Sequence, residues 1–210
     1  MEILTFELPP IGTNAYLLIA PGRDDAVLVD APPDALAAVS PTLAKLGRRL
    51  SAVLLTHGHW DHMADAAACR AAGAKIYAHA ADREWIENPM MQADFMITGL
   101  EIEPVKVDEF LTAGQTLQVA GLSFEVRHVP GHAPGNVLFY NREAGAAFVG
   151  DAIFAGSVGR YDLPGGDGRL LAKSIRTQVY TLPDETVIYP GHGPATTVAE
   201  EKVSNMFVRA

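Results

Sequence analysis

The chain has 210 residues, of which 49% are hydrophobic and 20% are charged, and its formal net charge is −9. This length and balance favour a single globular domain over residues 1–210 with a sizeable hydrophobic core. The excess of acidic residues argues against nucleic acid as a partner, because nucleic-acid binding needs a basic face.

The sequence predicts neither a secretory signal at the N-terminus nor insertion into a membrane. Residues 1–7 contain acidic side chains and no basic one, which argues against a secretory signal. No apolar run approaches the length of a membrane span, so we expect no membrane partner. Cys69 is the one cysteine, which excludes an intrachain disulfide, and its alanine-rich surroundings favour a buried thiol over a reactive one. We therefore expect a cytoplasmic protein.

Short apolar runs that end in turn residues predict a series of strands along the chain. In chain order they are residues 15–19, 26–29, 51–55, 75–78, 116–119, 122–126, 136–140, 146–149 and 186–189. The first two form a predicted hairpin. Because helices are predicted between several of these strands, the sequence belongs to the α/β class, with two halves and no linker between them.

Apolar residues at helical spacing predict helices at residues 34–46, 61–72 and about 169–180, and a closing helix near Val198. In the first of these, Pro41 predicts a kink, or a second helix that starts with Ser40 as its cap. Residues 80–104 are apolar without a regular period. They line a substrate entrance or, as the stronger alternative, pack beneath a loop.

Three histidines and one aspartate stand within six consecutive residues, directly after the strand at 51–55. They are His57, His59, Asp61 and His62. In open α/β folds, ligands bind at the carboxyl ends of strands. Imidazole nitrogen and carboxylate oxygen bind zinc, iron and manganese. Four such groups in one turn indicate more than one metal ion, because a catalytic zinc takes three protein ligands and a water.

Three further side chains of the same kind follow later strands. His132 stands in the Gly/Pro turn at 129–136, Asp151 directly follows the strand at 146–149, and His192 follows the strand at 186–189. Each alone is a weak signal, since an aspartate after a strand is usually a turn former. Together they repeat one arrangement: an apolar strand, a glycine or proline, and a metal-binding side chain.

This set resembles the metallo-β-lactamase superfamily, and the resemblance covers nearly the whole chain. It implies a four-layer αββα sandwich with the metal site along one edge of the two sheets. It also implies two divalent metal ions, with zinc as the first expectation and iron or manganese as alternatives. In that family the first ion would be held by His57, His59 and His132, the second by Asp61, His62 and His192, and Asp151 would bridge both.

Residues 156–166 and 189–197 are similar to short, one-domain glyoxalase-II-like hydrolases. Arg160 falls where that branch places a basic residue against the glutathione carboxylate, and an exposed, solvated arginine is the equal alternative. Asp162 stands about where the branch has a tyrosine. His79 and His128 are interpreted as structural residues or outer partners of the ligands.

The implied reaction is hydrolysis of S-acylglutathione or another small acyl thioester. Two ions roughly 3.5–4 Å apart share a bridging hydroxide that attacks the carbonyl carbon, and the second ion stabilises the oxyanion. Asp61 and Asp151 are the predicted catalytic carboxylates, since they hold the ions around that hydroxide. A thiolate leaves without a dedicated acid, so we predict no serine or cysteine nucleophile.

Other functions on the same fold remain open. A persulfide dioxygenase binds a single iron through two histidines and an aspartate, and metal content with oxygen uptake would distinguish it. A nuclease would need a basic surface, and a flavodiiron protein typically carries a glutamate where His59 stands. A metal-binding module without catalysis is disfavoured by the complete ligand set.

Overall fold

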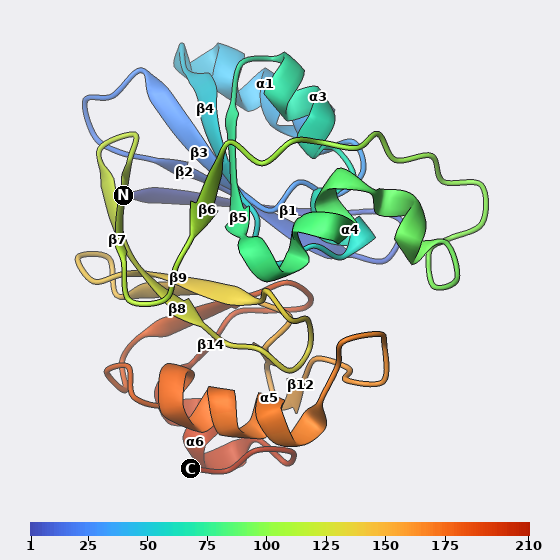
Figure 1. Ribbon diagram of the computed structural model, residues 1–210. Helices are drawn as coiled ribbons and strands as arrows, with labels where there is room; N and C mark the ends of the chain where they lie inside the picture. Colours follow the sequence, from blue (N-terminus) through green and yellow to red (C-terminus); the bar gives the residue numbers. More distant parts are fainter.

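The computed structural model describes residues 1–210 and shows two six-stranded sheets packed face to face, with helices on their outer faces (Figure 1). In order across the first sheet, the strands are β1 (Glu2–Leu8), β2 (Thr13–Ile19), β3 (Asp25–Val29), β4 (Arg49–Leu54), β5 (Lys75–His79) and β6 (Glu109–Leu111). Across the second they are β14 (Thr196–Thr197), β13 (Val187–Pro190), β10 (Ala146–Gly150), β9 (Val137–Asn141), β8 (Leu122–His128) and β7 (Thr116–Val119). Strands β11 (Ile153–Phe154) and β12 (Ser157–Val158) form a separate ribbon.

Helices cover the first sheet on one side and the second sheet on the other (Figure 1). The first group is α1 (Ala35–Leu46), α2 (Trp60–Met63), α3 (Ala66–Ala71) and α4 (Arg83–Glu87), with short 3₁₀ turns at η1 (Ala80–Asp82) and η2 (Pro89–Gln92). The second group is α5 (Gly168–Ser174), continued by a π-helical turn η3 (Ile175–Val179), and α6 (Val198–Ser204). The predicted four-layer αββα sandwich is therefore confirmed.

Three hydrophobic clusters occupy the three interfaces of this sandwich. Strand β2 shows how the sequence fills two of them, because its side chains alternate between the faces of the sheet. Leu17 packs toward α1 and α3, whereas Tyr16 and Leu18 pack between the sheets against Phe139 and Phe148 of the second sheet. A strand segment that packs on both faces is apolar at successive positions, which explains the unbroken apolar run at residues 15–19 of β2.

Two helix predictions need correction. The helix predicted over 61–72 is divided into α2 and α3, because the Asp65 carboxylate accepts a hydrogen bond from Leu36 N at 2.6 Å and the Asp65 amide donates to Ala31 O at 3.0 Å. No second helix starts at Ser40. Helix α1 runs through Pro41 to Leu46, and the Ser40 hydroxyl donates back to Leu36 O at 2.6 Å. Proline is tolerated here on the exposed face of the helix, where water reaches the carbonyl left without its partner.

The helix predicted over about 169–180 also differs from the structure. It is α-helical only over α5 and continues as the π-helical turn η3. Residues 80–104 contain side chains that pack against the core, which was the stronger alternative, and side chains that line a cavity. Phe95 and Ile97 line a cavity beside the clustered histidines, and Phe95 also packs against the core with Met96.

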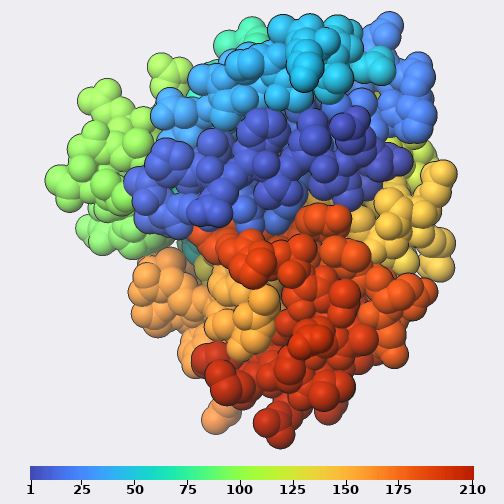
Figure 2. Space-filling model, turned by 180° about the vertical axis from the view of Figure 1, so that it is seen from behind, coloured from blue at the N-terminus to red at the C-terminus, as the bar shows by residue number.

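No helix in the structure has both the length and the apolar character that crossing a bilayer requires. From behind, the N-terminal strands and the C-terminal segment meet along one seam (Figure 2).

Candidate metal centre

The turn after β4 presents four metal-type side chains because it changes from extended to helical conformation. His59 is extended, with φ −67° and ψ 146°, and it occupies the N-cap position of α2. His57 and His59 therefore precede the helix, while the side chains of Asp61 and His62 project from its first turn. All four side chains are almost completely buried.

The second sheet supplies His132, Asp151 and His192 from three separate loops. Strands β10 and β13 are parallel, and β9 is antiparallel to both β8 and β10. The loops that follow β8, β10 and β13 consequently lie at the same edge of the sheet. This edge meets the turn after β4, so all the candidate ligands named from the sequence converge on one place.

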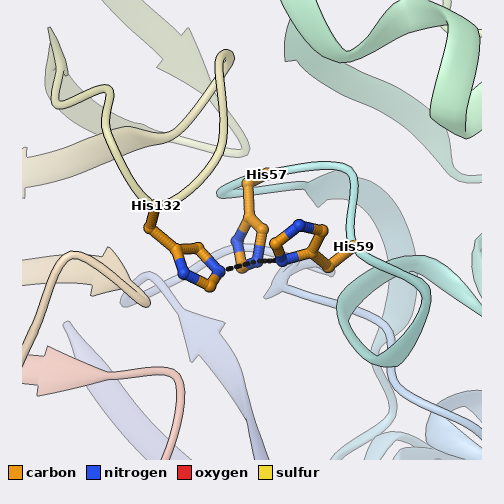
Figure 3. Close-up of side chains that lie close together, drawn as sticks. All are labelled: His57, His59 and His132. Carbon is orange, nitrogen blue, oxygen red and sulfur yellow. Dashed lines mark hydrogen bonds between the residues drawn. The ribbon is translucent and has the colours of Figure 1, made fainter. Parts of the chain in front are cut away.

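The donor atoms form two groups with a shared carboxylate between them. In the first group, His57 Nε2 lies 3.1 Å from His59 Nδ1 and 3.2 Å from His132 Nε2 (Figure 3). In the second, Asp61 Oδ2 lies 3.2 Å from both His62 Nε2 and His192 Nε2. The donor atoms within each group lie within 4.8 Å of one another.

Asp151 faces both groups with its two oxygens. Its Oδ1 lies 3.3 Å from His62 Nε2 of the second group. Its Oδ2 lies 3.6 Å from His132 Nε2 of the first group and 3.5 Å from His192 Nε2 of the second. This position between the two sets of donors is what a bridging ligand requires.

The charge state of the cluster suits divalent cations. Burial lowers the pKa of His59 to about 3 and holds the pKa of His57 well below its ordinary value, so both imidazoles are neutral and carry a lone pair. Burial also opposes a charged His62, but the carboxylates of Asp61, Asp151 and Asp30 raise its pKa well above the ordinary value overall. These carboxylates thus favour a positive charge at this place, which a divalent cation would supply instead of the proton. Of the donor atoms that face the cluster, His62 Nε2 and Asp151 Oδ1 are buried without a hydrogen-bond partner. The donor set therefore fits metal ions.

Outer hydrogen bonds orient the histidines so that their inner nitrogens face the cluster. His62 Nδ1 lies 2.8 Å from Asp30 Oδ2, and His132 Nδ1 lies 2.7 Å from Arg160 O. A proton on each Nδ1 would leave Nε2 free as a lone pair. The Thr13 hydroxyl donates to Asp61 Oδ2 at 2.9 Å, which holds that carboxylate in place.

Asp30 was not identified in the sequence analysis. It directly follows β3, as Asp151 follows β10, so the same strand-exit pattern was the available signal. Besides His62, its carboxylate accepts hydrogen bonds from the Thr56 amide at 2.7 Å and the Thr56 hydroxyl at 2.8 Å. Asp30 thereby joins the end of β3 to the turn that carries four candidate ligands.

A cavity of about 550 Å³ opens beside the two donor groups. Apolar side chains form much of its wall: Ile11, Phe95, Ile97, Phe154, Val158 and Leu163. Arg160 is the one Lys or Arg side chain in the lining, and it makes a two-point ion pair with Asp162, at 2.8 Å for each contact. Arg160 is thus exposed and already paired, and its backbone carbonyl rather than its side chain contacts a candidate ligand.

His79 and His128 lie outside the donor groups. Their rings stack with centroids 4.3 Å apart, and His128 Nε2 lies 2.7 Å from Pro134 O. Cys69 is fully buried as predicted, and burial raises the pKa of its thiol to about 12.

Comparisons with known proteins agree with this geometry. The profile of the metallo-beta-lactamase superfamily matches residues 8–192. Hydroxyacylglutathione hydrolase GloC from Haemophilus influenzae is 35% identical over 179 residues, with 80% of each chain covered. The solved structure of BLEG-1 B3 metallo-beta-lactamase has a TM-score of 0.92 and 36% identity over the full length of both chains. TTHA1623, solved in a di-iron-bound form, has a TM-score of 0.84 and 37% identity over 98% of this chain and all of that one.

The family profile spans all the loops that carry candidate ligands. Two solved structures are similar over nearly the whole chain, at more than one third sequence identity. Both findings assign the chain to the same family. This chain belongs to the metallo-beta-lactamase superfamily and is a metal-dependent hydrolase.

Proposed function

We propose that this protein is a dinuclear thioesterase that hydrolyses small acyl thioesters, S-acylglutathiones among them. The observation that carries the proposal is the pair of donor groups around Asp151, beside a cavity with largely apolar walls. Two relatives support it, one named a hydroxyacylglutathione hydrolase and the other solved with two irons.

In this proposal the chain's own residues hold the metal ions and orient the ligands, and they need not exchange protons with the substrate. Two bound divalent ions would supply a water acidified toward neutrality and a Lewis acid for the carbonyl oxygen. His57, His59 and His132 would hold the first ion, and Asp151 would bridge to the second. The other ligands of the second ion would be Asp61, His62 and His192. A thiolate leaving group requires no acid, and the cavity carboxylates Asp61 and Asp151 are both committed to the donor groups.

The cavity favours a small neutral acyl group over a charged one. Phe154 and Leu163 contribute apolar surface close to the donors, and burial of such surface stabilises an apolar ligand by roughly 25 cal/mol per Å². Since Arg160 is already paired with Asp162, the cavity offers no free cation to a glutathione carboxylate. We therefore expect glutathione thioesters to be turned over with a high KM rather than a low kcat.

Elemental analysis of the purified protein, combined with a substrate panel, tests this function. We expect two ions per chain, hydrolysis of S-lactoylglutathione, and hydrolysis of an S-acyl-N-acetylcysteamine whose thiol carries no carboxylate. The β-lactam nitrocefin belongs in the panel because a metallo-beta-lactamase is among the full-length structural neighbours. Turnover of nitrocefin without any thioester would contradict the proposal. A single iron with persulfide-dependent oxygen uptake would favour the dioxygenase instead.

A further inference from the structure

A carboxylate outside the donor groups connects the two loops that carry the first group. Asp82, at the end of η1, is 1% exposed. Its Oδ2 accepts a hydrogen bond from Gly58 N at 2.8 Å, and its Oδ1 accepts one from Gly135 N at 2.6 Å. It makes no ion pair with a lysine, arginine or histidine. A buried carboxylate without a cation depends on such donors, so these two amides are the partners that keep it in the interior.

Asp82 also stands where an aspartate would normally serve its own helix. It occupies the N-cap position of α4, which aspartate favours because its side chain can accept a hydrogen bond from the helix amides. Its side chain makes no such bond and turns to the two loops instead. Three residues later on α4, the Trp85 ring stacks on the His59 imidazole, with centroids 5.2 Å apart and an interplanar angle of 19°.

Both loops bring a glycine directly against this carboxylate. A Cβ at Gly58 would lie 2.9 Å from Asp82 Cβ, and a Cβ at Gly135 would lie 2.5 Å from Asp82 Cγ. Neither glycine has a positive φ, so close approach to Asp82, rather than backbone conformation, explains the lack of a side chain at both positions. The two loops are therefore built to meet at Asp82.

These loops carry the whole of the first donor group. Gly58 lies between His57 and His59, and Gly135 lies three residues after His132 in the same turn. His192 of the second group lies on a different loop that Asp82 does not contact, after β13. We propose that Asp82 is a positioning residue for the first group: by joining Gly58 to Gly135 it sets the distance of His132 from His57 and His59. This inference rests on the proposed two-ion function.

Metal affinity measured one group at a time provides the test. His192→Ala removes a ligand of the second group and leaves the first group intact, whereas His59→Ala does the reverse. Zn²⁺ affinity is measured by chelator competition in each background, with and without Asp82→Asn. The asparagine keeps the shape but turns an amide donor toward one of the two backbone amides. We expect Asp82→Asn to weaken Zn²⁺ binding roughly 10–100-fold in the His192→Ala background, and to change it by less than about twofold in the His59→Ala background.

Glu201→Gln is the matched control. Glu201 is also 1% exposed and also accepts a hydrogen bond from a backbone amide, at Gly156 N, but it touches neither loop. We expect this variant to leave Zn²⁺ affinity unchanged in both backgrounds. Equal weakening by Asp82→Asn in the two backgrounds would mean a general structural role and would overturn the proposal.

Amide exchange in the metal-free protein supplies a readout independent of any ion. We expect slow hydrogen exchange at Gly58 N and Gly135 N in the unsubstituted chain, and at least about tenfold faster exchange at one of them in Asp82→Asn. Rapid exchange at both amides of the unsubstituted chain would overturn the proposal even if the variant failed to fold. Slow exchange in a chain that binds no Zn²⁺ would contradict the proposed function and leave the connection itself intact.

Discussion

The two halves of the molecule contribute the same kind of side chain to the centre in opposite ways. The first sheet delivers His57, His59, Asp61 and His62 from a single turn, within six residues. The second sheet delivers His132, Asp151 and His192 from three loops that are far apart in sequence. The geometry of the turn is largely local, whereas the three loops are aligned only by the pairing of β8, β9, β10 and β13. The local arrangement can be recognised in the sequence. The sequence also names the dispersed residues, but only the completed sheet brings them together.

The largest expected effect tests the dispersed half. Asp151 faces both donor groups, so Asp151→Ala should reduce both metal occupancy and turnover, and by more than the roughly 10–100-fold typical of outer partners. Elemental analysis and kcat/KM on a thioester measure the two losses in one preparation. Asp184→Ala, at an exposed position in the same half, is the control. A variant with both ions and normal turnover would exclude Asp151 as the bridge.

The next prediction tests whether the turn after β4 keeps its geometry without support from a neighbouring strand. Asp30→Asn should reduce turnover or metal affinity roughly 10–100-fold, because Asp30 orients His62 and holds Thr56 of the same turn from a neighbouring strand. Asp24→Asn, whose carboxylate is almost fully exposed, should have no effect. Undiminished metal binding in Asp30→Asn would show that the turn keeps its geometry without support from β3.

A smaller effect is expected at the rim of the cavity. Arg160→Ala should raise KM for a glutathione thioester, because it leaves the negative charge of Asp162 unpaired beside the cavity, and Asp162→Ala should lower KM by freeing the guanidinium. An exposed charge pair contributes roughly 0.2–1 kcal/mol, so each change should be a few-fold, with kcat unchanged. The N-acetylcysteamine thioester, which lacks the carboxylate, is the control substrate. Equal KM changes on both substrates would mean that the charges of Arg160 and Asp162 do not act on the glutathione carboxylate.

The smallest effect is expected at Cys69, in the first half. Burial raises the pKa of its thiol to about 12, so the reactive thiolate is scarce in the folded protein near pH 8. A thiol reagent at that pH should leave the native protein unlabelled and should label one cysteine per chain after denaturation. Labelling of the native protein at a rate close to the denatured one would show that the packing around α3 opens readily.

The sequence was informative wherever the structure depends on neighbouring residues. Apolar runs located most strands of both sheets, and the strand-exit pattern located the seven side chains that converge. Strand β1 was missed, although Leu4 and Phe6 pack against the core, because Glu2, Thr5 and Glu7 leave it without a continuous apolar run. The division of helix 61–72 was missed because it depends on Leu36, 29 residues earlier.

The same limit applies to the residues around the candidate ligands. Asp30 and Asp82 are single acids beside short elements, and in a sequence such acids cannot be told from turn formers or helix caps. Their roles follow from partners 24 to 53 residues away, at Thr56, Gly58 and Gly135. Pairing over such distances is a property of the packed sheets, so it became visible only in the structure.

The position of His192 on the last donor-bearing loop has a consequence for the order in which the protein is made. A ribosome that adds about 5–20 residues per second needs roughly 3–12 s to proceed from His132 to His192. Throughout that interval the nascent chain already contains all three histidines of the first group. The second group has only Asp61 and His62 until His192 is added. Synthesis from the N-terminus therefore completes the two groups one after the other, the first before the second.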